Sequence, residues 1–324
     1  MLIDQHGRQL RYLRLAVTDR CNLRCRYCMP EEGIAFAPRE ALLNYGEILY
    51  LCDVLAELGI NKVRLTGGEP LVRRDLPLLV RGLAELFPRL AMTTNGVLLP
   101  RHLDELTAAG LTHYNLSLDT LRPDRFFAIT RRDEFAATRY ALDELLRRQY
   151  PVKINVVVMR GKNDDELADF VELTRASAVE VRFIEAMPFN DDDGNHDVFI
   201  AYADMLERLR STYPNLEQTP HQEGSAVTFR VPGYRGRVGI IPAYSRSLCG
   251  SCDRLRLTPR GTMLNCLYST QGLELLPLLR QGIGRDELTD LIRTYVHGKY
   301  ATGHETERHE QRGSIFASMT SIGG

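Results

Sequence analysis

The sequence predicts an α/β fold built around a parallel sheet. Short apolar, β-branched runs alternate with longer amphipathic segments through residues 13–185, and parallel strands need connections of that length, usually helices. Each predicted strand ends in polar or glycine residues, and the carboxyl edge of a parallel sheet is where α/β proteins carry their chemistry. The 324 residues leave ample room for a core. This pattern fits either an open doubly wound sheet or a barrel.

Six strands are predicted, at residues 13–18, 62–66, 90–96 with its turn, 113–119, 152–159 and 180–185. Helices are expected between them, at residues 44–58, 75–86, 103–109, 135–149 and 164–175, because apolar residues recur there at helical spacing. Gly59 follows the first helix as its C-cap. The periodic pattern stops beyond Pro188, where residues 190–195 form an acidic, turn-rich link. Two domains are therefore expected, at residues 1–188 and 189–324.

The composition is that of an ordinary globular protein, with 44% hydrophobic and 26% charged residues. A formal net charge of -1 argues against a dedicated nucleic-acid binder. The sequence contains no apolar run of about 18 residues that would span a membrane, and its first residues lack an apolar signal core. We therefore expect no membrane association and a cytoplasmic location.

Three cysteines, Cys21, Cys25 and Cys28, lie directly after the first predicted strand. Thiolates this close together are ligands for zinc or for an iron-sulfur cluster. The next twenty residues offer no obvious fourth ligand, so one coordination position could be held open for a substrate or cofactor. Reduced cysteines or a structural zinc knuckle are the alternatives. A seventh cysteine, Cys52, lies on the apolar stripe of a predicted helix and is expected to be buried.

A second group of three cysteines comprises Cys249, Cys252 and Cys266. By spacing alone this group is as compatible with zinc, completed by a histidine such as His221 or His297, as with an iron-sulfur cluster. Arg254 and Arg256 lie between the thiols and share one face if this segment is a strand. Paired guanidinium groups suit an anion such as a triphosphate, although arginines in this spacing are also common on solvated surfaces.

The predicted strand at 62–66 runs into Gly67-Gly68-Glu69-Pro70. A glycine-rich loop in this position is either a tight turn or a place where the backbone approaches a ligand closely, since glycine has no Cβ.

The C-x3-C-x2-C spacing of the first group, with Tyr27 before the third cysteine, resembles the radical S-adenosylmethionine superfamily, and so does the Gly-Gly-Glu-Pro loop. In that superfamily three cysteines hold a 4Fe-4S cluster whose fourth iron binds the methionine moiety of the cofactor. Both cysteine groups, the stretch 254–261 and the stretch Ile322-Gly323-Gly324 together resemble the GTP 3',8-cyclase family of molybdenum cofactor biosynthesis. The resemblance covers essentially the whole chain.

The resemblance implies an incomplete (β/α)6 barrel with a C-terminal domain that carries a second 4Fe-4S cluster. It implies a lyase that uses a 5'-deoxyadenosyl radical from S-adenosylmethionine to convert GTP to (8S)-3',8-cyclo-7,8-dihydroguanosine 5'-triphosphate. The residues expected to ligate the clusters are Cys21, Cys25 and Cys28 for the first and Cys249, Cys252 and Cys266 for the second. The residues expected to contact S-adenosylmethionine are Tyr27, Gly68, Ser117, Lys153, Asn155 and Met187.

The same resemblance implies that six residues contact GTP, namely Arg14, Lys62, Arg64, Thr93, Arg254 and Arg256. The catalytic residues expected are Arg14, Arg254, Arg256, Gly323 and Gly324. The implied partners are a small electron-donor protein, a downstream cyclic pyranopterin monophosphate synthase and a second copy of the chain in a homodimer.

Four other interpretations are compatible with parts of the pattern. A peptide-modifying radical enzyme with an auxiliary cluster would share the first cysteine group, and a zinc-binding module would need neither cluster. A frayed end is the usual state of a short polar terminus such as residues 314–324, and a Gly-Gly terminus can also be activated as a carrier.

Overall fold

The computed structural model describes residues 1–187, 198–220, 224–245, 249–310 and 319–323. Its main sheet has twelve strands. In spatial order they are β14 (Leu273–Glu274), β13 (Thr262–Leu264), β12 (Arg254–Leu257), β3 (Tyr12–Ala16), β4 (Lys62–Thr66), β5 (Arg89–Thr94), β6 (His113–Ser117), β7 (Val152–Val158), β8 (Glu180–Glu185), β11 (Arg237–Ile241), β10 (Val227–Arg230) and β9 (Glu217–Gln218). A separate antiparallel hairpin joins β1 (Leu2–Ile3) to β2 (Gln9–Leu10).

The six predicted strands are β3 to β8, and they lie side by side in chain order with parallel pairing throughout. This confirms the α/β class and the mostly parallel sheet. The later part of the chain extends the same sheet at both edges: β12 pairs parallel with β3, and β11 pairs parallel with β8. Strands from both sides of the domain boundary expected at residue 188 thus belong to one sheet. The link expected at residues 190–195 lies outside the described residues.

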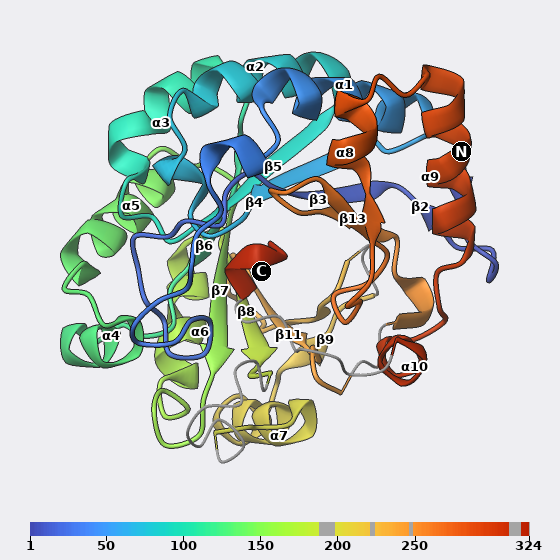
Figure 1. Cartoon of the computed structure of the whole chain (residues 1–324). Helices are drawn as coiled ribbons and strands as arrows, with labels where there is room; N and C mark the ends of the chain where they lie inside the picture. Colours follow the sequence, from blue (N-terminus) through green and yellow to red (C-terminus); the bar gives the residue numbers. More distant parts are fainter. Residues whose placement is uncertain (188–197, 221–223, 246–248, 311–318, 324) are drawn as a thin grey trace.

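Helices cover the outer side of the curved parallel strands (Figure 1). They are α1 (Tyr45–Glu57), α2 (Leu76–Leu86), α3 (Leu99–Ala108), α4 (Pro123–Thr130), α5 (Phe135–Arg147) and α6 (Leu167–Ala176). The later helices are α7 (Tyr202–Thr212), α8 (Leu275–Arg280), α9 (Arg285–His297) and α10 (Gly303–His309). Single 3-10 turns occur at Arg39–Ala41, Pro70–Val72, Cys249–Ser251 and Met319–Ser321.

Local sequence signals explain where several helices begin and end. Asn44 caps α1 in a capping box with Glu47, and Gly59 follows the helix with a φ of 100°. The prediction for α1 is thus confirmed. Helix α3 begins four residues earlier than predicted and has a proline in its first turn, where proline is tolerated. Helix α4, which also begins at a proline, was not predicted.

Alternation along the strands separates the core from a polar inner face. Leu13, Leu15, Val63 and Leu65 are fully buried and belong to the main hydrophobic cluster with residues of the covering helices. The intervening residues point to the opposite side, because successive side chains of a strand alternate. On β3 and β4 these include Arg14 and Arg64, so the concave side of the sheet is charged. None of the helices in the described ranges is long and apolar enough to cross a membrane.

A buried carboxylate on the connection into α6 should be important for stability. Glu166 is fully buried and accepts hydrogen bonds from Thr120 Oγ1 at 2.7 Å, Leu121 N at 2.7 Å and Arg125 Nη1 at 2.9 Å. Glu166→Ala should lower the free energy of unfolding by about 2–3 kcal/mol, since it leaves the buried Thr120 hydroxyl and the partly buried Leu121 amide and Arg125 guanidinium without their acceptor. Urea unfolding followed by circular dichroism measures the change. Asp169→Asn removes an exposed carboxylate of the same helix and should change stability by less than about 0.5 kcal/mol; equal losses would contradict the assignment.

Candidate active site

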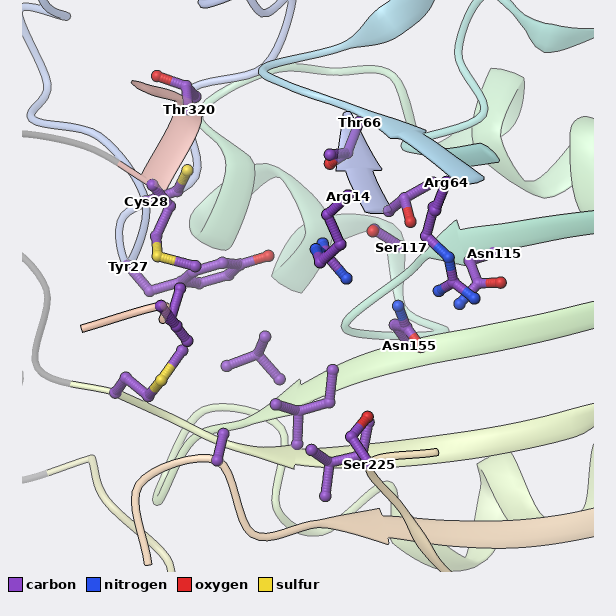
Figure 2. Close-up of a pocket in the computed structure, with 18 of the residues that line it drawn as sticks. Arg14, Tyr27, Cys28, Arg64, Thr66, Asn115, Ser117, Asn155, Ser225 and Thr320 are labelled. Atoms are coloured by element: carbon purple, nitrogen blue, oxygen red, sulfur yellow. The ribbon is translucent and has the colours of Figure 1, made fainter. Parts of the chain in front are cut away.

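A cavity of about 340 Å³ lies at the carboxyl ends of the parallel strands. Its lining includes residues of the first half of the chain, such as Arg14, Tyr27 and Asn155 (Figure 2). Residues of β8, of β12 and of the segment after β13 also line it. All six cysteines of the two predicted groups line it. The structure thus brings together two cysteine groups that are more than 200 residues apart in the sequence.

The first cysteine group lies on the loop that follows β3. Backbone amides of Cys28 and Met29 both donate to Cys25 O at 3.0 Å, which folds the Cys25–Cys28 segment into a tight turn. The end of α4 anchors the same loop, since Arg24 N donates to Thr130 O and Arg26 N to Ile129 O, each at 3.0 Å. The helix that the sequence did not predict therefore supports the cysteine loop.

The electrostatics of this loop fit a cationic iron-sulfur core. Burial, followed by the negative charges of Asp119, Cys28 and Cys21, raises the pKa of the Cys25 thiol well above its usual value. The thiols would therefore be ligands only where a positive group offsets their mutual repulsion. No three His, Cys, Asp or Glu side chains of the described residues are close enough to share a single ion. In a 4Fe-4S cluster, however, each thiolate binds a different iron.

The second cysteine group is held by the turn Cys249–Ser251 and by the segment after β13. Cys252 N donates to Cys249 O at 3.0 Å. Burial alone would raise the pKa of the Cys252 thiol, but the charges of Arg254 and Lys299 lower this pKa to about 6. Of the two histidines considered as zinc ligands, His297 is exposed at the end of α9 and does not line the cavity, while His221 lies outside the described residues.

Five predicted phosphate-binding cations form one patch across three neighbouring strands. Arg14 on β3 lies opposite Arg64 on β4 and opposite Arg256 on β12, and the preceding pairs place Lys62 and Arg254 beside Tyr12. Burial, and then the charges of Arg14 and Arg254, lower the pKa of Arg256 to about 9. Burial likewise lowers the pKa of Arg64 to about 10. Like charges held this close in a buried site favour the binding of an anion.

Several buried polar atoms of the cavity have no hydrogen-bond partner among the described residues. They belong to side chains on β4, β5, β6 and β7: Arg64 Nε, Thr93 Oγ1, Asn115 Nδ2 and Asn155 Oδ1. Figure 2 shows Arg64, Asn115 and Asn155 facing the same space as Arg14, with Tyr27 and Cys28 across from them. Because buried polar groups are normally paired, these atoms indicate a polar ligand.

The glycine-rich loop packs tightly against the backbone that leads into the first cysteine group. Gly68 N donates to Thr18 O at 2.8 Å, and Glu69 N donates to Arg20 O at 2.8 Å. A Cβ at Gly68 would lie 2.2 Å from Arg20 O, and one at Gly67, whose φ is 140°, would lie 2.3 Å from Thr18 O. Only glycine permits this approach, so the loop is more than an ordinary tight turn.

Of the residues predicted to contact S-adenosylmethionine, five line the cavity: Tyr27, Gly68, Ser117, Asn155 and Met187. The Tyr27 hydroxyl donates to Asp119 at 2.8 Å, and the Met187 sulfur accepts from Tyr268 at 3.3 Å. Lys153 and Lys62 do not line the cavity. They lie two residues nearer the amino ends of β7 and β4 than Asn155 and Arg64, and Lys153 pairs with Glu180 at 3.2 Å.

The stretch near residue 323 lies against the arginine patch. Gly323 O accepts hydrogen bonds from Arg256 Nη1 at 2.7 Å and from Arg14 Nη2 at 3.3 Å. Gly323 has a φ of 73°, and a Cβ there would lie 2.9 Å from side-chain atoms of both Ala16 and Thr66. The end of the described chain is thus packed on the sheet beside the cavity (Figure 1). Gly324 lies outside the described residues.

Sequence reasoning missed several residues of the site. Arg182 on β8 lies opposite Asn155 on β7 and lines the cavity. Asn115 and Asp119 line it as well. The alternation of Glu180, Arg182 and Ile184 repeats that of Lys62, Arg64 and Thr66, so strand periodicity could have identified Arg182.

Comparisons with known proteins agree with this arrangement. Residues 15–174 match the family model described as "Radical SAM superfamily", and residues 179–305 match the one described as "Molybdenum Cofactor Synthesis C". The chain is 41% identical over 334 residues to the GTP 3',8-cyclase of Chlorobaculum tepidum, covering 100% of this chain and 97% of the relative. It is 40% identical to the GTP 3',8-cyclase of Syntrophomonas wolfei, with 94% of each chain covered.

Some relatives are much longer. The chain is 43% identical over 302 residues to "Molybdenum cofactor biosynthesis protein 1" of Homo sapiens, covering 92% of this chain and 48% of the relative. It thus spans about half the length of such relatives. The crystal structure of Streptococcus suis SuiB bound to S-adenosylmethionine matches with a TM-score of 0.57 at 14% identity, covering 88% of this chain and 68% of that chain. That likeness shows a shared fold.

The arginine patch should change the ionisation of a tyrosine within it. Burial alone would raise the pKa of Tyr12, but four nearby positive charges lower this pKa to about 8. They belong to Arg64, Arg14, Lys62 and Arg254. Absorbance at the phenolate band should therefore show one tyrosine ionising near pH 8, and Tyr12→Phe should remove that transition alone. Because the folded pKa is below the ordinary value of about 10, the phenolate stabilises the fold above pH 8 and gives no stabilisation below it. Identical titrations of both proteins between pH 7 and 9 would refute this.

Proposed function

We propose that this chain, which belongs to the GTP 3',8-cyclase family of radical S-adenosylmethionine proteins, is itself a GTP 3',8-cyclase. One observation carries the proposal. A single cavity holds both cysteine groups together with a buried arginine patch and polar atoms that lack partners among the described residues. Such a cavity suits a substrate with a triphosphate at one end and a base at the other.

The first cysteine group would hold a 4Fe-4S cluster through Cys21, Cys25 and Cys28, beside S-adenosylmethionine. When bound, this pair supplies the 5'-deoxyadenosyl radical that abstracts hydrogen from the GTP ribose. Gly68, which lets its loop pack against the backbone leading into the first cysteine group, would lie beside the methionine end of the cofactor, and Tyr27, held by Asp119, would orient the other side. Ser117, Asn155 and Met187 complete the lining. Lys153, which pairs with Glu180, would act at longer range.

The inner face of the sheet would hold the substrate. Arg14, Arg64, Arg182 and Arg256 all line the cavity, and their guanidinium groups can bind phosphate oxygens bidentately. Lys62, two residues before Arg64 on β4, would add positive charge next to the cavity without lining it. Thr93 Oγ1 is a buried hydroxyl without a partner among the described residues, so it would bind the sugar or a phosphate. Fixing the substrate at both ends places the ribose for hydrogen abstraction, a step that tolerates little misplacement.

The second cysteine group would hold another 4Fe-4S cluster and leave one iron open for the guanine. Its ligands would be Cys249, Cys252 and Cys266, on the side of the cavity formed by β12 and β13. Gly323 would close this side by its contacts with Arg14 and Arg256, and Gly324 would follow it.

The finer architecture and the partners belong to the same proposal. Eight parallel strands from β12 to β11, with helices outside β3 to β8, support an incomplete barrel that the later part of the chain completes. The family resemblance adds a small electron-donor protein, a cyclic pyranopterin monophosphate synthase that takes the product, and a homodimer.

Arg256 should bind the triphosphate by charge. Arg256→Ala should weaken GTP binding by about 1.5–3 kcal/mol, the range for hydrogen bonds to charged groups, and should weaken guanosine binding far less. Anaerobic calorimetric titration measures both affinities. Arg260→Ala is the matched control, since Arg260 is exposed just beyond β12. If GTP and guanosine lose the same affinity, Arg256 has a structural role only.

The two cysteine groups should have separable roles. The test is anaerobic incubation with GTP, S-adenosylmethionine and dithionite, followed by the mass of the product and an assay of 5'-deoxyadenosine. Cys25→Ala removes a ligand of the first cluster, so both products should disappear. Cys252→Ala leaves the first cluster intact, so 5'-deoxyadenosine should still form without cyclised nucleotide. Wild-type protein that forms no cyclised nucleotide would overturn the proposed function, and equal loss of both products in both variants would overturn the separation of roles.

A further inference from the structure

We propose that Lys299 is a positioning residue and counter-ion of the second cluster: it fixes the two segments that carry Cys252 and Cys266, and its positive charge makes that cluster easier to reduce. The inference rests on the proposed second cluster. No step of the proposed reaction uses Lys299.

Lys299 lies just after α9 and is only 3% exposed. Its ammonium group donates to Arg254 O at 3.1 Å and to Asn265 O. Arg254 comes two residues after Cys252, and Asn265 immediately precedes Cys266. One side chain therefore ties together the segments on which two of the three cysteines lie.

The backbone around Lys299 is itself held by the N-terminal hairpin. Gln5 N donates to His297 O at 3.0 Å, and Gln5 Nε2 donates to Lys299 O at 3.2 Å. Arg8 Nη1 donates to Ala301 O at 2.7 Å and to Cys249 O at 2.9 Å. The hairpin thus fixes the backbone at Lys299 and at Cys249, the third cysteine of the group. Lys299 and Arg8 together thus bind the backbone at or near each of the three cysteines.

Arg8 and Lys299 differ in how their positive charges are balanced. Arg8 is paired with the carboxylate of Asp4 at 2.6 Å, so its charge is balanced within the protein. Lys299 meets two neutral carbonyl oxygens and, among the described residues, no carboxylate. Burying an unpaired ammonium group is unfavourable unless an anion lies nearby.

The cysteine group can supply that anion. The two carbonyls that Lys299 contacts belong to Arg254 and Asn265, which lie within two positions of Cys252 and Cys266, so a thiolate-ligated cluster at these cysteines would be the nearby anion. Three thiolate ligands give a 4Fe-4S cluster a net negative charge, and reduction makes this charge larger by one. A fixed cation nearby therefore stabilises the reduced state more than the oxidised state, and cluster potentials depend on such charges and on exposure.

The test compares Lys299→Met with the wild-type chain. Methionine has a similar length and no charge, so it removes the charge with little change in volume. Anaerobically reconstituted full-length proteins would be titrated redox-potentiometrically and followed by electron paramagnetic resonance. The same titration of Cys25→Ala identifies the signal of the second cluster. We expect this signal to shift to lower potential in Lys299→Met, while the first cluster keeps its potential.

Two further variants make the result decisive. Lys162→Met removes the same charge from an exposed position and should leave both potentials unchanged. Lys299→Arg keeps the charge, so it should keep the potential near that of the wild type. If Lys299→Met loses iron from the second cysteine group and Lys299→Arg retains it, the positioning role is supported.

The outcomes that overturn the inference are distinct from failure of the proposed function. An occupied second cluster with an unchanged potential in Lys299→Met overturns the inference alone, as does equal loss of iron in both Lys299 variants. A wild-type chain whose iron content equals that of Cys252→Ala overturns the proposed second cluster as well.

Discussion

The cavity of this protein depends on positive charges that are buried together on the inner face of the main sheet. Parallel pairing of β12, β3 and β4 places Arg14, Arg64 and Arg256 in register, and the cost of holding them there is what makes the cavity receptive to an anion. The low pKa of Tyr12 and the hydrogen bonds from Arg14 and Arg256 to Gly323 O are consequences of the same crowding. A triphosphate would offset the repulsion among these arginines more completely than the Tyr12 phenolate or the Gly323 carbonyl does.

The sheet also brings the two cysteine groups to one cavity. The first follows β3, and the second flanks β12, which is the parallel neighbour of β3. Adjacent strands share a carboxyl edge, so both loops open into the same space. This arrangement suits chemistry in which a radical formed at one side must reach a substrate fixed at the other.

Supporting contacts come from parts of the chain with no chemistry of their own. The end of α4 anchors the first cysteine loop, while the N-terminal hairpin and Lys299 hold the second. Each support uses backbone carbonyls or amides, so it fixes the position of a loop whatever its side chains are. Preorganisation of this kind keeps the ligands of a metal site in place before the metal binds.

The sequence by itself determined the six strands β3 to β8, the first helix with its cap, and both cysteine groups, because period, capping residues and ligand spacing are local properties. It did not reveal α4, whose short helix carries no strong periodicity. Strand periodicity indicates the face on which Arg182 lies, but its position opposite Asn155 depends on the pairing of β7 with β8. The pairing of β12 with β3 joins residues more than 240 positions apart. The hydrogen bonds of Lys299 join residues more than 30 positions apart. No local pattern encodes such contacts, since they depend on which strand edges remain open once the central sheet has formed; only the tertiary structure decided them.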